Sequence, residues 1–172
     1  MSRNLRAELA ELKNPNFIIE LQGASVGIAP DRPNDSVVTS FVSISNLGAP
    51  SVAREWRVSV TRPGSTEVIN AIAIIPPLQG RVILERENQP PVTIPATEEL
   101  ASKTAQNPIA RGEARVGYLL FMVEGIPWTV LREEKIALTV TAKDIHGREY
   151  SAIKQRSGVP GAAPYVPGLP LR

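Results

Sequence analysis

Short stretches in which every second residue is apolar recur along this chain, separated by proline, glycine and asparagine. The clearest pair lies in VSISNLGAPSVAREWRVSV, residues 42–60. Val42 and Ile44 alternate with polar residues before a turn, and Trp56 and Val58 alternate with polar residues after it. An alternation of this kind is typical of strands with one buried face and one solvated face. The pattern therefore predicts antiparallel strands.

The same pattern predicts further strands along the chain. They are expected at residues 17–21, 36–46, 54–62, 67–75, 81–85, 115–123, 135–143 and 148–153. The strand at 115–123 is apolar on both faces, which favours a central or covered position. Trp128–Leu131 is expected to add a short strand or a strand bend, and the segment DIHG, residues 144–147, a hairpin loop.

Two connections between these strands stand out. Residues 27–36 are expected to form a loop, because they hold two prolines, two aspartates and an asparagine. Residues 86–110 are polar and rich in proline, and Thr97 could cap one or two helical turns there. A connection of that length in a compact domain is either functional or a crossover between two sheets.

The two ends of the chain differ from the part between them. In residues 1–15, Leu5, Leu9 and Leu12 share one helical stripe, which predicts an N-terminal helical arm. Residues 158–172 are rich in proline and glycine, which predicts a flexible tail. The folded domain is thus expected at 16–157. Docking of the arm on the domain is one alternative for residues 1–15, and self-association through the arm is another.

Composition narrows the classes of protein. The 172 residues are enough for one domain. The absence of cysteine excludes disulfides, thiolate metal sites and cysteine nucleophiles. A net charge of +2 without clustered Lys and Arg predicts no nucleic-acid partner. Residues 1–15 lack the apolar segment of a signal peptide, and no run approaches the ~20 apolar residues of a membrane helix.

Catalytic chemistry has little support in the residues. His146 is the only histidine, and Asp144 stands two residues before it. In a hairpin loop that ends in Gly147, this aspartate is expected to serve turn geometry. The nucleophile, zinc and phosphate-loop motifs of known enzymes are missing. We therefore expect no enzyme, no catalytic residues, no metal site and no cofactor.

Three residues are candidates for binding. Trp128, beside a proline and a glycine in GIPWT, is expected to be partly exposed and available for contact. Arg111 and Arg115 flank Gly112 at a strand entry and could hold an anion, although structural arginines paired with carboxylates are an equal alternative. Trp56, in contrast, is expected in the core between the sheets.

Three blocks of sequence resemble a group of uncharacterised bacterial domains with an immunoglobulin-like sandwich. The blocks are SISNLGAPSVAREWRVSV (43–60), NPIARGEARVGYLLFMVEG (107–125) and LTVTAKDIHGREYSA (138–152). The resemblance implies an all-β, immunoglobulin-like antiparallel β-sandwich of seven to nine strands, here with a short N-terminal helix. It implies no activity. Relatives often carry a membrane helix before the domain. The resemblance therefore leaves two alternatives for the localisation: a periplasmic domain with an upstream membrane anchor, or a cytoplasmic protein.

The functional hypothesis from the sequence is a non-catalytic binding or assembly module with a protein partner. The fold offers loops and sheet edges for such contacts. The alternative is a carbohydrate-binding or hydrolytic domain that uses the 86–110 connection. That alternative expects a groove lined by exposed Trp128 or Tyr118, with acidic residues opposite.

Overall fold

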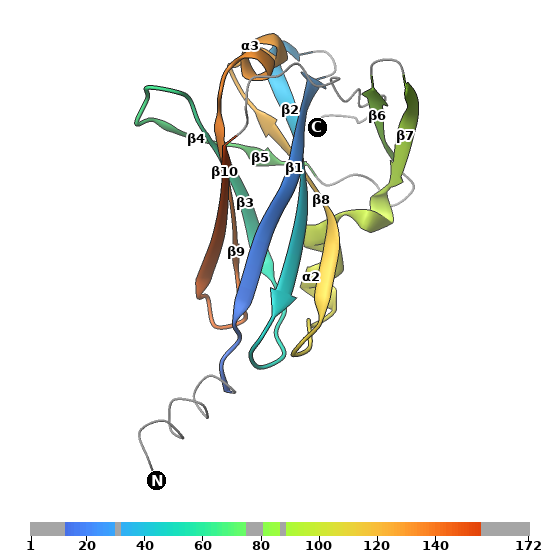
Figure 1. Cartoon of the computed structure of the whole chain (residues 1–172), viewed down its shortest axis with the longest axis vertical. Coiled ribbons are helices and arrows are strands. Elements are labelled where there is room, and N and C mark those ends of the chain that lie inside the picture. The colour runs from blue at the N-terminus through green and yellow to red at the C-terminus, as the bar shows by residue number, and fades with distance from the viewer. Residues whose placement is uncertain (1–12, 30–31, 75–80, 87–88, 156–172) are drawn as a thin grey trace.

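The computed structural model describes residues 13–29, 32–74, 81–86 and 89–155. Two four-stranded antiparallel sheets face each other, and a separate two-stranded ribbon stands beside them (Figure 1). The first sheet has the order β1-β2-β8-β5, with bounds Phe17–Ala29, Arg32–Asn46, Ala114–Val123 and Ile72–Ala73. The second has the order β10-β9-β3-β4, with bounds Glu149–Gln155, Ala137–Lys143, Arg54–Thr61 and Val68–Asn70. The ribbon is β6-β7, Arg81–Arg86 and Gln89–Pro95.

The helices of the described residues are short. A 3₁₀ turn, η1 (Ala96–Glu98), leads into α2 (Leu100–Gln106), which packs against β8 and β3. The helix α3 (Trp128–Glu133) packs against β1 and β2. The described part of the chain is therefore all-β, with η1, α2 and α3 in the connections between strands.

One hydrophobic core fills the space between the two sheets. The alternating residues of each sheet share it, because successive side chains of a strand point to opposite faces. The first sheet contributes Val38, Val42 and Ile44 from β2 and Leu119, Phe121 and Val123 from β8. The second contributes Trp56, Val58 and Val60 from β3 and Leu138, Val140 and Ala142 from β9. The strand alternation read from the sequence is confirmed at these positions.

The central strand β8 is buried on both faces from Tyr118 to Val123. It lies between β2 and β5, as its two apolar faces predict. Its outward residues Tyr118 and Leu120 form a second small cluster with Val37 and Ala29, and Ile94 of β7 is one of the residues that pack against that cluster. The first sheet is thus covered on its outer side as well.

At one end of the sheets, the buried side-chain amide of Asn46 holds several loops together. Its Nδ2 donates to the carbonyls of Ala49, at 2.7 Å, and Ile109, at 2.9 Å. Its Oδ1 accepts from the backbone N–H groups of Gly48, at 2.9 Å, and Asn16, at 3.1 Å. The turn predicted at residues 46–50 therefore also fixes the chain before β1 and the entry to β8.

Two expectations for strands and loops are wrong. Residues 27–36 are mostly strand, not loop, because β1 and β2 form one long hairpin. Pro33 falls where the pairing shifts from Ile28↔Ser36 to Ala29↔Arg32, so it has no ladder hydrogen bond to lose. Trp128–Leu131 is helical, because the extended Pro127 precedes it at the N-cap position.

The single strand expected at 67–75 is two strands in different sheets. β4 pairs with β3 of the second sheet, and β5 pairs with β8 of the first. Between them, the N–H of Ala71 donates to the carbonyl of Val58, and directly after β5 the N–H of Ile74 donates to the carbonyl of Leu120. An apolar run interrupted by Asn70 alone does not reveal this switch, because both sheets bury apolar residues.

The long connection expected at 86–110 contains helical turns, as the sequence predicted, and also the strand β7, which it did not predict. β7 holds three prolines, which an edge strand tolerates, and its ladder in the described residues runs to β6 alone. The cap of α2 is Glu99 rather than Thr97. The predicted helical arm falls on residues that lie outside the described ones apart from its last few positions, and the predicted tail lies outside them entirely, so the helix has no support here.

Candidate functional site

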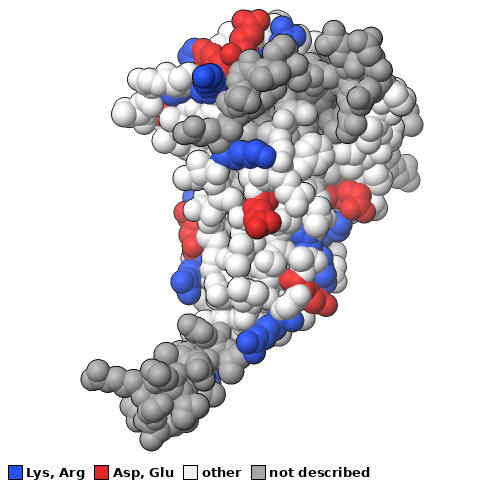
Figure 2. All heavy atoms as spheres, in the orientation of Figure 1, with Lys and Arg blue, Asp and Glu red and all other residues white. Residues whose placement is uncertain are grey.

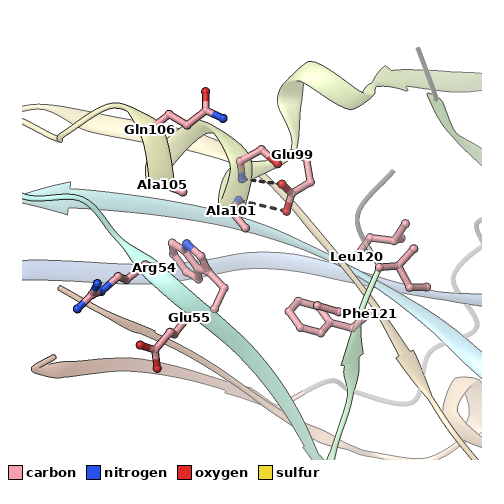
Figure 3. A pocket seen from close by; sticks show the side chains of 12 residues that line it. Arg54, Glu55, Glu99, Ala101, Ala105, Gln106, Leu120 and Phe121 are labelled. Carbon is pink, nitrogen blue, oxygen red and sulfur yellow. Dashed lines mark hydrogen bonds between the residues drawn. The ribbon is translucent and has the colours of Figure 1, made fainter. Parts of the chain in front are cut away.

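A hollow of about 320 Å³ opens between α2, β3, β5 and β8 (Figure 3). Its floor consists of side chains that are almost fully buried: Trp56, Glu99, Leu120 and Phe121. Its rim consists of exposed residues: Arg54, Glu55, Ala73, Ser102, Ala105 and Gln106. We call this hollow the α2 groove. Small side chains, with three alanines among the lining residues, leave the space open.

The helix that forms one wall is fixed at its first turn. The carboxylate of Glu99 accepts hydrogen bonds from the N–H of Ala101, at 3.1 Å, and of Ser102, at 2.7 Å. A side-chain acceptor at this position satisfies N–H groups that have no partner inside the helix. The chain before α2 lies close to β8, since a Cβ on Gly117 would lie 2.5 Å from the carbonyl oxygen of Glu98. These contacts place α2 over the edge of β8.

The opposite wall is a distorted part of β3. The pairing with β9 shifts between Arg54 and Arg57, which is a β-bulge, and Glu55 within it has a φ of 51°. A positive φ is unusual for a residue other than glycine, and bulges and such conformations are enriched at functional sites. The indole Nε1 of Trp56 donates to Oγ1 of Thr104 in α2, at 3.0 Å. The bulge thus brings the tryptophan to the helix.

Cations outnumber carboxylates beside the bulge. Glu55 accepts a hydrogen bond from Lys143, at 2.7 Å, and lies 3.7 Å from Arg57. The hydrogen bond and the charge of Lys143 lower the pKa of Glu55. Arg54 on the rim bonds only to the carbonyl of Ile145 among the contacts described, at 3.1 Å. On the face shown in Figure 2, in contrast, charges of both signs are interspersed, so we treat the excess at the bulge as local.

The three candidate binding residues from the sequence do not form one site. Arg111 lies in the turn before β8, and Arg115 is in that strand, bonded to Glu113 at 3.0 Å. Trp128 lies beyond the other end of β8, as the first residue of α3, with Arg132 over its ring at 4.8 Å. None of the three lines the α2 groove.

The hydrogen bonds around Asp144 are those of a turn. Its Oδ1 accepts from the N–H of His146, at 2.8 Å, and of Arg148, at 3.0 Å, while Oδ2 accepts from Tyr150 Oη, at 3.1 Å. The carboxylate is buried and the histidine is exposed. Across the described ranges, no three His, Cys, Asp or Glu residues come close enough to hold a metal ion.

Tyr118 is buried rather than exposed, contrary to the expectation for a groove on the 86–110 connection. Desolvation is the main cause that raises its pKa to about 12, with smaller contributions from the nearby charges of Glu99 and Glu98. That connection does line the α2 groove, through α2. The alternative from the sequence thus named the connection that lines the groove, but not the opposite wall, because neither the bulge at Glu55 nor the meeting of α2 with β3 leaves a local pattern.

Comparisons with known proteins do not assign the chain to a family. No protein-family model and no curated protein matches the chain. The crystal structure of a candidate lipoprotein (ycdA) from Bacillus subtilis subsp. subtilis strain 168 is similar to it, with 11% sequence identity and a TM-score of 0.43. The match covers 84% of this chain and 38% of that chain, and similarity at this level carries no argument about function. Among the described residues, no helix has the length and apolar character to cross a membrane.

Proposed function

We propose that this chain is a non-catalytic binding module of the immunoglobulin-like sandwich class, and that it recognises another protein through the α2 groove. One observation carries the proposal: the groove has a buried, largely apolar floor and an open rim of exposed residues. Hollows of this size and lining are the usual place for a ligand group.

The strand order supports the immunoglobulin-like part of the proposal. The order β1-β2-β8-β5 corresponds to strands A-B-E-D of that fold, and β10-β9-β3-β4 corresponds to G-F-C with an added C′. The buried Trp56 on β3 occupies the place of the tryptophan on strand C. Since folds host many functions, this correspondence supports the class and not the activity.

The chemistry of the groove favours binding over catalysis. Its buried carboxylate, Glu99, already accepts two backbone hydrogen bonds, and Glu55 is paired with Lys143. A carbohydrate-binding or hydrolytic site would need exposed aromatic faces or carboxylates free to act. Here the rings of Trp56 and Phe121 lie in the floor and are nearly covered.

A blocking substitution tests the proposal. Random peptides displayed on phage are selected on the wild-type protein, and the selected peptides are then measured against Ala105→Trp and Ala114→Trp. Both alanines are exposed, but only Ala105 lines the groove. We expect peptides that bind the wild type and Ala114→Trp and lose binding at least tenfold to Ala105→Trp. If every selected peptide binds all three proteins alike, the groove is not the binding site.

A further inference from the structure

Resting on the proposed function, we propose that the partner segment recognised by the α2 groove carries a large apolar side chain flanked by acidic residues. The apolar side chain enters the groove, and the acidic residues meet the cations of the bulge in β3. This inference names the chemistry of the partner, which the proposed function leaves open.

The apolar anchor follows from the floor of the groove. Leu120 and Phe121 of β8 line the groove together with Trp56 of β3, and Ile74 adds a partly buried aliphatic wall. The volume, about 320 Å³, is at the small end of ligand sites and suits one or two side chains rather than an extended small molecule. Large apolar side chains seated in such hollows contribute most of the energy in many protein interfaces.

The acidic flanks follow from the charges on the β3 side. Arg54, Arg57 and Lys143 stand beside the carboxylate of Glu55, and Glu149 lies opposite Lys143 in the pairing of β10 with β9, which leaves an excess of one positive charge. Arg54 itself lines the groove, whereas the carboxylate of Glu55 on the same rim is already paired with Lys143. On the α2 side, Glu98 is paired with Lys103 at 2.8 Å, and Glu99 caps the helix. A partner segment therefore meets positive charge on one side of the groove, which acidic residues complement.

A protein segment fits the groove better than a free amphiphile. The rim residues Arg54, Ala105 and Gln106 are exposed, so the groove is open along one side. An acyl chain alone would leave part of its length in water there. A side chain carried by a protein brings neighbouring surface that covers the rim and excludes water from the contact.

The experiment uses the groove-dependent peptides, defined as those that lose binding to Ala105→Trp. Their affinities are measured for the wild type, for Arg54→Glu/Arg57→Glu and for a matched control, Arg111→Glu/Lys135→Glu. All four positions are exposed. Thermal melting checks that each variant is folded. Sodium laurate, a free carboxylate with an acyl chain, is titrated against the wild type as a separate probe.

We expect these peptides to carry Asp or Glu next to a large apolar residue, to bind the charge-reversed variant at least tenfold more weakly, and to bind the control normally. Their affinity should also fall with added salt, because exposed charges are screened. Groove-dependent peptides that lack acidic residues, or that ignore the reversal, would overturn this inference and leave the proposed function standing. Laurate bound in the groove with no groove-dependent peptide would overturn both.

Discussion

At the scale of single residues, buried polar groups hold together the loops at one end of the two sheets. Asn46 satisfies four backbone groups from three loops, and Asp144 accepts three hydrogen bonds within one hairpin. A buried polar group without a partner lowers the folding stability by more than a paired group raises it. The loops are therefore held in the conformations that pair these side chains. The sequence predicted the turn role of Asp144 from its hairpin position, but not the reach of Asn46 to Ile109.

Trp56 gives the first prediction at this scale. It is buried in the core and joined to Thr104 in α2. We expect Trp56→Ala to lower the free energy of unfolding by about 3–5 kcal/mol, because it leaves a large cavity. Chemical denaturation measures this. His146→Ala, at an exposed loop position, is the control, and its expected change is within about 0.5 kcal/mol. Wild-type stability in the Trp56 variant would contradict the placement of β3.

Removing the hydroxyl group from Tyr150 and from Tyr118 is expected to change the stability differently, because the two hydroxyls differ in their hydrogen bonds. Tyr150 Oη donates to the carbonyl of Pro15, at 2.8 Å, or to Asp144. The hydroxyl of Tyr118 is buried and has no partner among the described residues. We expect Tyr150→Phe to cost about 1–2 kcal/mol in urea denaturation and Tyr118→Phe to be neutral or stabilising. The reverse order of the two variants would show that the hydroxyl of Tyr118 has a partner.

Alkaline pH gives a third prediction. The pKa of Tyr118 is raised from 10.0 to about 12, so the folded protein keeps this proton at pH values where the unfolded chain has lost it. This contribution to stability is complete below about pH 10 and is lost as the pH rises toward 12. The melting temperature is measured at about pH 9 and at about pH 11. We expect the decrease between these two pH values to be smaller for Tyr118→Phe than for the wild type. Equal falls would argue that Tyr118 is not buried as a neutral group.

At the scale of elements, strands were easier to predict than helices and connections. The alternation of β2, β3, β8 and β9 was visible because one face of each is buried in the shared core. The break between β4 and β5 was not, because an apolar run does not say which sheet buries it. The strand β7 was hidden by its prolines, and α3 by its length of six residues. Of these misses, the break between β4 and β5 depends on a contact between segments distant in sequence, since β5 pairs with β8.

The helix α2 supports a prediction about its cap. Glu99→Ala removes two hydrogen bonds at the first turn of α2, and we expect it to cost about 1–2 kcal/mol in denaturant unfolding. The neighbouring Glu98→Ala is the control. Glu98 is exposed, and its ion pair with Lys103 is worth about 0.5 kcal/mol or less. Because α2 forms one wall of the groove, Glu99→Ala should also weaken groove-dependent peptides. Equal costs for the two variants would mean that the cap does not hold the helix.

At the scale of the whole molecule, the candidate site lies where the two sheets end in their shortest strands. β4 and β5 have three and two residues, and the chain passes there from one sheet to the other. The α2 groove lies beside this crossing, between residues of both sheets. The all-β class could be predicted from the sequence. The groove could not, because it is formed by four segments that alternation alone does not bring together.

The most direct test of the account is a map of where a groove-selected peptide binds. NMR chemical-shift changes are recorded for methyl and amide groups during titration with the tightest such peptide. The account predicts that the largest changes fall on residues of the groove, among them Ile74, Ala105 and Leu120. Changes centred instead on Trp128, or on the turn that holds Arg111, would contradict it and place the binding surface at an end of the sheets.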